Sequence, residues 1–144
     1  MKDLRIANWL LSLPEEFQLS EKEVDNHFER EDGRIEVFLK SIKTVSPSTS
    51  KENAENIQAT HASSFLELSG YRWNISKKAV AQGEQFISTL ELCDPDKKYF
   101  VVSIVVSQLD EAIQVTVHDY LYDDGRDEAR AICNRIAKSI KRVV

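Results

Sequence analysis

The sequence predicts an α+β fold, in which two main helices pack on an antiparallel sheet of about five to seven strands in the order β-β-β-α-β-β-β-β-α. Strand-like segments follow one another over residues 85–122, and an amphipathic helix follows them at once and continues to the C-terminus. A second helical stripe lies in the middle of the chain. With 144 residues, 42% of them hydrophobic and only 4 of them glycine, residues 1–144 are expected to form a single domain.

The N-terminal third predicts short strands. Residues 5–13 and 34–42 are interpreted as strands, the second because its side chains alternate in character. The sequence Glu-Asp-Gly-Arg at residues 31–34 is typical of a hairpin turn, which would join the second strand to a short one at residues 26–30. An alternative for the start of the chain is a short helix over residues 2–11, because its apolar residues also fit a helical period.

A helix of about 20 residues is predicted in the middle of the chain. Thr49, followed three residues later by Glu52, has the spacing of a capping box, and Gly70 supplies a stop signal at the other end. Between these signals lies one stripe at helical spacing, formed by Ala54, Ile57, His61, Phe65 and Leu68.

Strands and tight turns are predicted after this helix. Trp73 and Ile75 indicate a short strand, and longer strands are expected at residues 82–92, 99–107 and 112–121. The intervening turns have typical Asp-, Pro- and Glu-containing sequences. Alternation in the last strand assigns Ile113, Val115 and Val117 to one face of the sheet, and Gln114, Thr116, His118 and Tyr120 to the other.

The last predicted element is an amphipathic helix. Asp123 or Asp124 is its expected cap, and acidic residues in its first turn suit the helix dipole. Its basic end is expected to comprise Arg135, Lys138, Lys141 and Arg142. A helix that is apolar on one side must pack against the sheet. That apolar stripe comprises Ala129, Ile132, Cys133, Ile136 and Ile140.

Charge and composition exclude several classes of partner and location. The 24 acidic and 19 basic residues give a formal net charge of -5, which argues against an extended phosphate-binding surface and therefore against a nucleic-acid partner. Residues 6–13 are too short and too polar a stretch for a signal peptide or a membrane span, so a cytoplasmic location is expected. Cys93 and Cys133 form no Cys-x-x-Cys pair and are expected to be reduced thiols.

The order of elements, the segment Leu-Ser-Leu-Pro-Glu-Glu-Phe at residues 11–17, and a closing strand followed at once by a C-terminal helix resemble the DcrB/PsbP-like superfamily over most of the chain. The resemblance implies a binding protein without catalytic residues. Families with this fold include photosystem subunits, a Ran-GTPase-binding group and chaperones of type VI secretion effectors. Because no site motif of these families is matched, the resemblance assigns no functional residue.

Known catalytic and ligand-binding signatures are absent from the sequence. His27, His61 and His118 are scattered without ligand spacing, so neither a metal nor a cofactor is expected. No Gly-x-Ser-x-Gly elbow or glycine-rich phosphate loop is present. His118 and Asp119 are adjacent in a predicted strand and therefore point to opposite faces, so they cannot form a catalytic dyad unless a bulge intervenes. His61 is interpreted as a hydrogen-bonded core or boundary histidine.

Two groups of residues are candidates for binding a partner. The polar face of the last strand provides the first, because tyrosine and histidine make good interface anchors. The alternatives are that a helix covers this face and that the acidic residues are only solvated. The candidate residues are Gln114, Thr116, His118, Tyr120 and Tyr122 on that face, and Glu29, Glu31 and Asp32 in the acidic first third of the chain. Tyr71 and Trp73 form a second aromatic candidate, with Trp73 expected in the core.

The leading hypothesis is a non-enzymatic, cytoplasmic protein-binding module of the immunity type, which neutralises a bacterial toxin. Small size, acidic charge and the absence of catalytic signatures favour it. The alternative is a chaperone or adaptor for a type VI secreted effector. A third hypothesis is a small-ligand binder or enzyme that uses the face of His118 and Tyr120. The sequence identifies neither the partner nor the oligomeric state.

Overall fold

The computed structural model of the protein describes residues 1–20, 26–43, 49–123 and 127–143. The strands before the first helix are β1 (Lys2–Ile6), β2 (Trp9–Leu13), β3 (Phe17–Leu19), β4 (His27–Arg30) and β5 (Ile35–Lys43). The remaining elements are α1 (Ser50–Leu66), β6 (Asn74–Gln82), β7 (Gln85–Asp94), a 3-10 turn (Pro95–Lys97), β8 (Tyr99–Gln108), β9 (Glu111–Asp119), α2 (Glu128–Lys138) and β10 (Lys141–Arg142).

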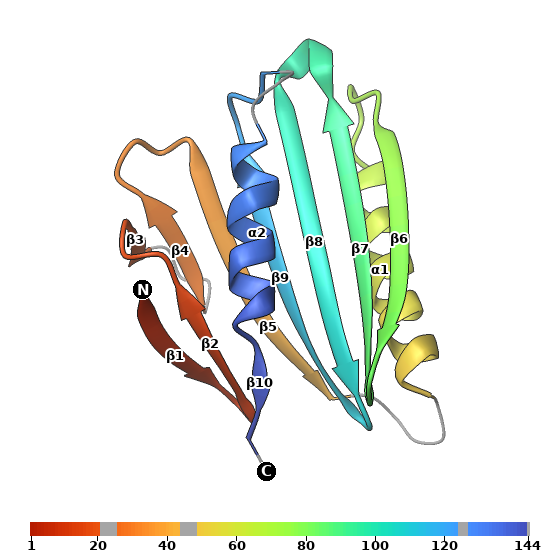
Figure 1. The fold of residues 1–144 in the computed structure, drawn as a ribbon. Coiled ribbons are helices and arrows are strands. Elements are labelled where there is room, and N and C mark those ends of the chain that lie inside the picture. Colours follow the sequence, from red (N-terminus) through yellow and green to blue (C-terminus); the bar gives the residue numbers. More distant parts are fainter. Residues whose placement is uncertain (21–25, 44–48, 124–126, 144) are drawn as a thin grey trace.

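Two helices lie on opposite faces of a seven-stranded sheet (Figure 1). Its strands are all antiparallel, in the order β3-β4-β5-β9-β8-β7-β6. A smaller sheet with the order β1-β2-β10 lies beside α2 (Figure 1). The predicted α+β class, with two helices on an antiparallel sheet, is confirmed.

The N-terminal segment forms a hairpin in place of the single strand expected at residues 5–13. The chain turns at Ala7, a non-glycine residue with a φ of 52° in the left-handed region. The turn separates β1 from β2 and brings Ile6 opposite Trp9. The alternative of a helix over residues 2–11 is wrong. By contrast, the predicted hairpin between β4 and β5 is confirmed, and Gly33 adopts a φ of 68° at its turn.

Helix α1 begins at the predicted cap. Glu52 donates its backbone N–H to the hydroxyl of Thr49 over 3.1 Å, which confirms the capping box. The helix ends at Leu66, before the stop expected at Gly70, and Leu68 lies outside it and is 48% exposed. Leu68 therefore does not belong to the buried stripe. The buried residues of α1 are Asn53, Ala54, Gln58, Ala62 and Phe65, which are mostly small or polar.

The segment after α1 differs from the prediction. Strand β6 has nine residues, all exposed, because it is an edge strand with no helix over it among the described residues. The chain then turns at Gly83, where φ is 60°, so the strand expected at residues 82–92 begins only at Gln85. The predicted alternation in β9 is confirmed by its register with β5 and β8.

Helix α2 is shorter at both ends than expected. Asp127 occupies its N-cap position without a side-chain hydrogen bond to the helix backbone, Asp123 precedes the helix, and Asp124 lies outside the described residues. The helix ends at Lys138, and Lys141 and Arg142 form β10, which pairs with β2. The expected basic helix end is therefore wrong for those two residues. The predicted apolar stripe is confirmed for Ala129, Ile132, Cys133 and Ile136, which lie buried in α2. Ile140 is also buried but follows the helix.

The main core lies between the sheet and the layer formed by α2 and the small sheet. It includes the fully or nearly fully buried side chains of Trp9, Leu13, Ile113 and Ile136. Cys133 is also buried there, and burial raises the pKa of its thiol. Cys93 and Cys133 form no disulfide with each other. Within the described residues, neither helix is long and apolar enough to cross a bilayer.

Candidate functional site

The side of the sheet that carries α1 is only partly covered. Helix α1 packs on β7 and β8, and no second helix among the described residues lies over β9, β5 and β4 on that side (Figure 1). The strand registers place alternate side chains of these three strands on the same face as α1. We call it the α1-side face; its members are His27, Glu29, Glu36, Phe38, Lys40, Ile42, Gln114, Thr116 and His118.

A cluster of rings lies at one end of this face. Tyr71 stacks on Trp73 with ring centroids 4.9 Å apart, and Tyr99 lies 5.4 Å from both Trp73 and Tyr120. The ring of His118 lies 5.8 Å from that of Tyr99. We call these five residues the aromatic cluster. Tyr120 is 37% exposed and the other four are half-buried, so the cluster presents ring surface to the solvent.

The imidazole of His118 and the hydroxyl of Tyr99 are neutral at neutral pH. Burial lowers the pKa of His118 to about 4 and raises that of Tyr99 to about 12. The hydroxyl of Tyr99 lies 2.6 Å from Nδ1 of His118. Because both groups are neutral, the hydroxyl donates to Nδ1 and the imidazole proton is on Nε2.

A buried carboxylate links the aromatic cluster to β4. Oε2 of Glu36 accepts a hydrogen bond from the hydroxyl of Tyr120 over 3.0 Å and lies 2.8 Å from Nε2 of His27. Burial and this hydrogen bond raise the pKa of Tyr120. His27 stacks on Phe38 with ring centroids 4.1 Å apart. Glu29 is directly opposite Glu36, so these two glutamates and His27 are the described residues most suited to holding a metal ion.

A buried polar network connects α1 to the sheet. The amide of Gln58 donates to the carbonyl oxygens of Ser88 and Ser103, and the hydroxyl of Ser103 donates back to Gln58. Gln114 donates to Ser103 over 3.1 Å and to Nδ1 of His61 over 2.9 Å. Burial lowers the pKa of His61. His61 is thus a hydrogen-bonded boundary residue, as predicted.

A groove of about 660 Å³ runs between α1 and β5. Its lining comprises Lys40, Ser41, Ile42, Lys43, Asn56, Ile57, Thr60, His61, Ser64 and Gln114. Among these residues two are lysines and none is acidic, although the whole chain has a net charge of -5. The groove is therefore locally positive, whereas Glu36 and Glu29 lie toward the other end of the same face.

The structure separates the predicted binding residues of β9. Gln114 and Thr116 are buried, and His118 and Tyr120 belong to the aromatic cluster. Tyr122 was expected on the same face, but β9 ends at Asp119, and Tyr122 stacks on Phe100, which belongs to the main core, with centroids 4.8 Å apart. Tyr122 therefore lies on the α2 side of the sheet.

The acidic candidates also have different surroundings. Glu29 is half-buried on the α1-side face, whereas Glu31 and Asp32 are exposed at the β4–β5 turn. Arg30 binds Asp32 through Nε and Nη2, and this hydrogen bonding lowers the pKa of Asp32. Asp32 is thus already paired within the chain, while Glu31 lies beside it at the surface.

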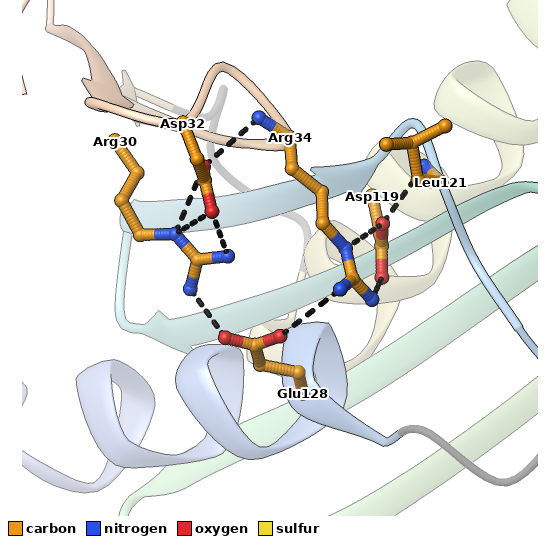
Figure 2. Close-up of polar contacts among 6 residues, drawn as sticks. All are labelled: Arg30, Asp32, Arg34, Asp119, Leu121 and Glu128. Carbon is orange, nitrogen blue, oxygen red and sulfur yellow. Dashed lines mark hydrogen bonds and ion pairs between the residues drawn. The ribbon is translucent and has the colours of Figure 1, made fainter.

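Figure 2 shows that this ion pair belongs to a larger network on the α2 side. Arg30 and Arg34 reach opposite oxygens of Glu128, at the start of α2. Arg34 also binds both carboxylate oxygens of the fully buried Asp119, at 3.1 and 3.2 Å. These ion pairs connect the β4–β5 hairpin with the start of α2 and with the end of β9, so the role of the network is structural. As predicted, Asp119 and His118 point to opposite faces.

Sequence reasoning missed three parts of this site. Tyr99 was not a candidate, although its position at the start of a strand, beside a turn, was a usable signal. Lys40 was interpreted only as one of the alternating residues of a strand, and Lys43, beyond the predicted end of that strand, was given no role. Their contribution to a groove depends on where α1 lies, which the sequence does not specify.

Comparisons with known proteins support the fold. No family model and no curated protein matches the sequence. The structure is similar to that of PsbP (CyanoP) from the cyanobacterium Synechocystis sp. PCC 6803, with a TM-score of 0.68 and 11% identity, covering 98% of this chain and 91% of that one. It is also similar to the Ran-binding protein Mog1p of Saccharomyces cerevisiae, with a TM-score of 0.60 and 17% identity, covering 99% and 95% of the two chains. The chain therefore has a PsbP/Mog1-like fold, in agreement with the resemblance at the level of fold.

Proposed function

We propose that this chain is a non-catalytic protein-binding module that contacts its partner through the aromatic cluster and the adjoining groove. The observation that carries the proposal is the gathering of Tyr71, Trp73, Tyr99, His118 and Tyr120 at the surface of a sheet face that α1 leaves partly uncovered. Aromatic side chains are enriched in protein interfaces, and tyrosine and tryptophan are frequent hot spots.

The chemistry of the cluster favours binding over proton transfer. A general acid or base works best when its pKa lies near the operating pH. Burial instead moves the pKa of His118 down to about 4 and that of Tyr99 up to about 12. These groups therefore remain neutral and act as rigid hydrogen-bonding and stacking surfaces, which supports a partner-binding role.

The likeness to Mog1p gives further support at the level of fold, because that protein is described as Ran-binding. A shared fold does not transfer a partner or a binding residue, so the argument for this chain rests on its own surface. The comparisons give no support to the finer hypotheses of toxin neutralisation and effector chaperoning.

The charge of the groove specifies one property of the partner. Lys40 and Lys43 are exposed at its lining, with no acidic neighbour among the described lining residues. A partner segment with acidic side chains would complement this charge, and the attraction would help to fix its orientation in the groove. A basic partner segment would instead match the surface near the exposed Glu31, at the β4–β5 turn.

The test is site-specific photo-crosslinking in the native cells. A photoreactive residue replaces Tyr120 in one variant and Leu109, which is 67% exposed at the far β8–β9 turn, in a control variant. We expect a discrete protein adduct from position 120 and none from position 109. Equal adducts from both positions, or none from position 120, would count against this binding face.

The captured protein then allows a quantitative test. Lys40→Glu is expected to weaken its binding, whereas Lys77→Glu, at an exposed position of β6, serves as the matched control. Suppression of a toxin's activity would identify immunity, and capture of an effector's N-terminal segment would identify a chaperone. If position 120 gives no protein adduct, but replacing Tyr120 abolishes the binding of a small molecule or an enzymatic activity, the third hypothesis would instead be favoured.

A further inference from the structure

We propose that His27, Glu29 and Glu36 form a binding site for one divalent transition-metal ion of the zinc class. The ligand atoms of these residues all lie within 4.8 Å of one another. One imidazole nitrogen with two carboxylate oxygens is a donor set that Zn²⁺ and neighbouring first-row ions accept. The inference goes beyond the proposed function, because binding a protein partner does not itself require a metal.

The strand register brings these side chains together. His27 and Glu29 are alternate residues of β4 and share a face, and Glu29 is directly opposite Glu36 on β5. Two like charges directly opposite each other on neighbouring strands destabilise a sheet. Glu36 is only 8% exposed, so water screens the repulsion poorly. A cation between the two carboxylates would convert this repulsion into attraction.

The distances suit coordination to one ion. Nε2 of His27 lies 2.8 Å from Oε2 of Glu36. This separation is that of a hydrogen bond. Two ligands of a tetrahedral ion, each about 2.1 Å from it, are about 3.4 Å apart, so a small movement of the two side chains would let one ion replace the bonding proton. The half-buried Glu29 leaves a path from the solvent for the ion and for coordinated water.

Neighbouring groups hold the ligands in place. Phe38 stacks on the ring of His27 with an interplanar angle of 7°, and the hydroxyl of Tyr120 donates to Glu36. Such outer contacts orient the ligands of metal sites. The other ring nitrogen of His27, Nδ1, is buried without a hydrogen-bond partner among the described residues, so stacking on Phe38, and not an outer hydrogen bond, orients this ring.

The primary test is calorimetric titration of Zn²⁺ into untagged protein that has been freed of metal by a chelator. We expect one ion per chain and a higher melting temperature in the presence of Zn²⁺, because the ion binds the folded state. An excess of Mg²⁺ is expected not to displace it. Absence of binding, or displacement by Mg²⁺, would overturn the proposal.

A matched pair of variants assigns the ligands. Glu29→Gln is expected to weaken Zn²⁺ binding by more than about 100-fold, because loss of a ligand exceeds the 10–100-fold effect of losing an outer contact. Glu31→Gln removes the same charge from the exposed turn next to β4 and is expected to leave the affinity unchanged. Equal affinities for these two variants would contradict the site.

Two further variants test whether other side chains bind the ion and whether a loss of affinity reflects a change in the fold. Tyr120→Phe is expected to keep the fold and to lower the affinity by about 10–100-fold through the lost contact with Glu36. Cys93→Ser is expected to bind Zn²⁺ as the wild type does, since Cys93 is not part of the site. Loss of binding in Cys93→Ser, or unchanged binding in Tyr120→Phe, would count against the assigned ligands.

Discussion

The two faces of the large sheet are packed by different chemistry. On the α2 side, Ile132, Cys133 and Ile136 enter an apolar core with Val102 and Val115. On the α1 side, the contact between helix and sheet includes a buried hydrogen-bond network, centred on the fully buried hydroxyl of Ser103. Only small apolar clusters flank this network.

This difference assigns different tasks to the two sides. Apolar burial contributes free energy in proportion to area and does not depend on the direction of individual bonds. A buried polar network contributes less net stability, but it fixes the positions of its members, because each unpaired group is costly. We therefore expect mutations on the α2 side to affect mainly stability, and mutations on the α1-side face to affect mainly binding.

The largest expected effect is in the α2-side core. Ile136→Ala is expected to lower the free energy of unfolding by about 2–5 kcal/mol, because it leaves a cavity beside a side chain that is fully buried. Ile75→Ala, at a position that is 39% exposed in β6, is the control and should cost much less. Chemical denaturation measures both changes. Equal losses would contradict the assignment of stability to the α2 side.

The ion-pair network in Figure 2 allows a buried and a half-exposed carboxylate on the α2 side to be compared. Asp119→Ala is expected to cost about 3 kcal/mol, because it leaves Arg34 without its buried partner and removes the acceptor for the backbone N–H of Leu121. Asp32→Ala, in the same network but with a half-exposed carboxylate, should cost less than about 1 kcal/mol. Urea denaturation at low and high salt checks both values, and the reverse order would refute the burial argument.

Strand β8 has two buried serines, of which only Ser103 belongs to the α1-side network. Ser103→Ala is expected to cost about 1–2 kcal/mol, because it leaves Gln58 and Gln114 short of a partner. Ser107 is equally buried, but its hydroxyl has no partner in the described parts of the chain, so Ser107→Ala should be neutral or slightly stabilising. Thermal or urea denaturation distinguishes them. Similar values for both would show that the network contributes nothing.

The last expected effect appears only at acidic pH. Burial lowers the pKa of His118 from 6.5 to about 4, so the unfolded state binds this proton more tightly than the folded state does. The stability that His118 contributes is therefore complete above about pH 6.5 and is lost as the pH falls toward 4. His118→Gln should reduce the slope of unfolding free energy against pH in this window. An unchanged slope would mean that His118 does not titrate as described.

Local patterns predicted the fold class well because each rests on nearby residues. The capping box at Thr49, the glycine turn at Gly33 and the alternation of β9 all involve short sequence separations. The hairpin of β1 and β2 was missed because Ala7 gives no turn signal. Strand β10 was missed because Lys141 and Arg142 also suit a helix end, and only pairing with the distant β2 makes them a strand.

The candidate site was less predictable, because it depends on strand register and helix placement. His118 and Tyr120 were identified from alternation, but Tyr122 was misplaced since the chain leaves the strand after Asp119. The contact between Glu29 and Glu36 follows from the register of β4 against β5, which the hairpin turn alone does not specify. The groove beside α1 depends on which strands that helix covers.

The most direct test measures affinity and stability together in two variants, with the partner captured by photo-crosslinking. Tyr120→Ala on the α1-side face is expected to weaken binding by about 1–2 kcal/mol and to lower stability by no more than about 1 kcal/mol. Ile136→Val in the α2-side core is expected to leave affinity unchanged and to lower stability by about 0.5–1.5 kcal/mol. If Tyr120→Ala binds as tightly as the wild type, or if both variants change affinity equally, the two sides do not have separate tasks.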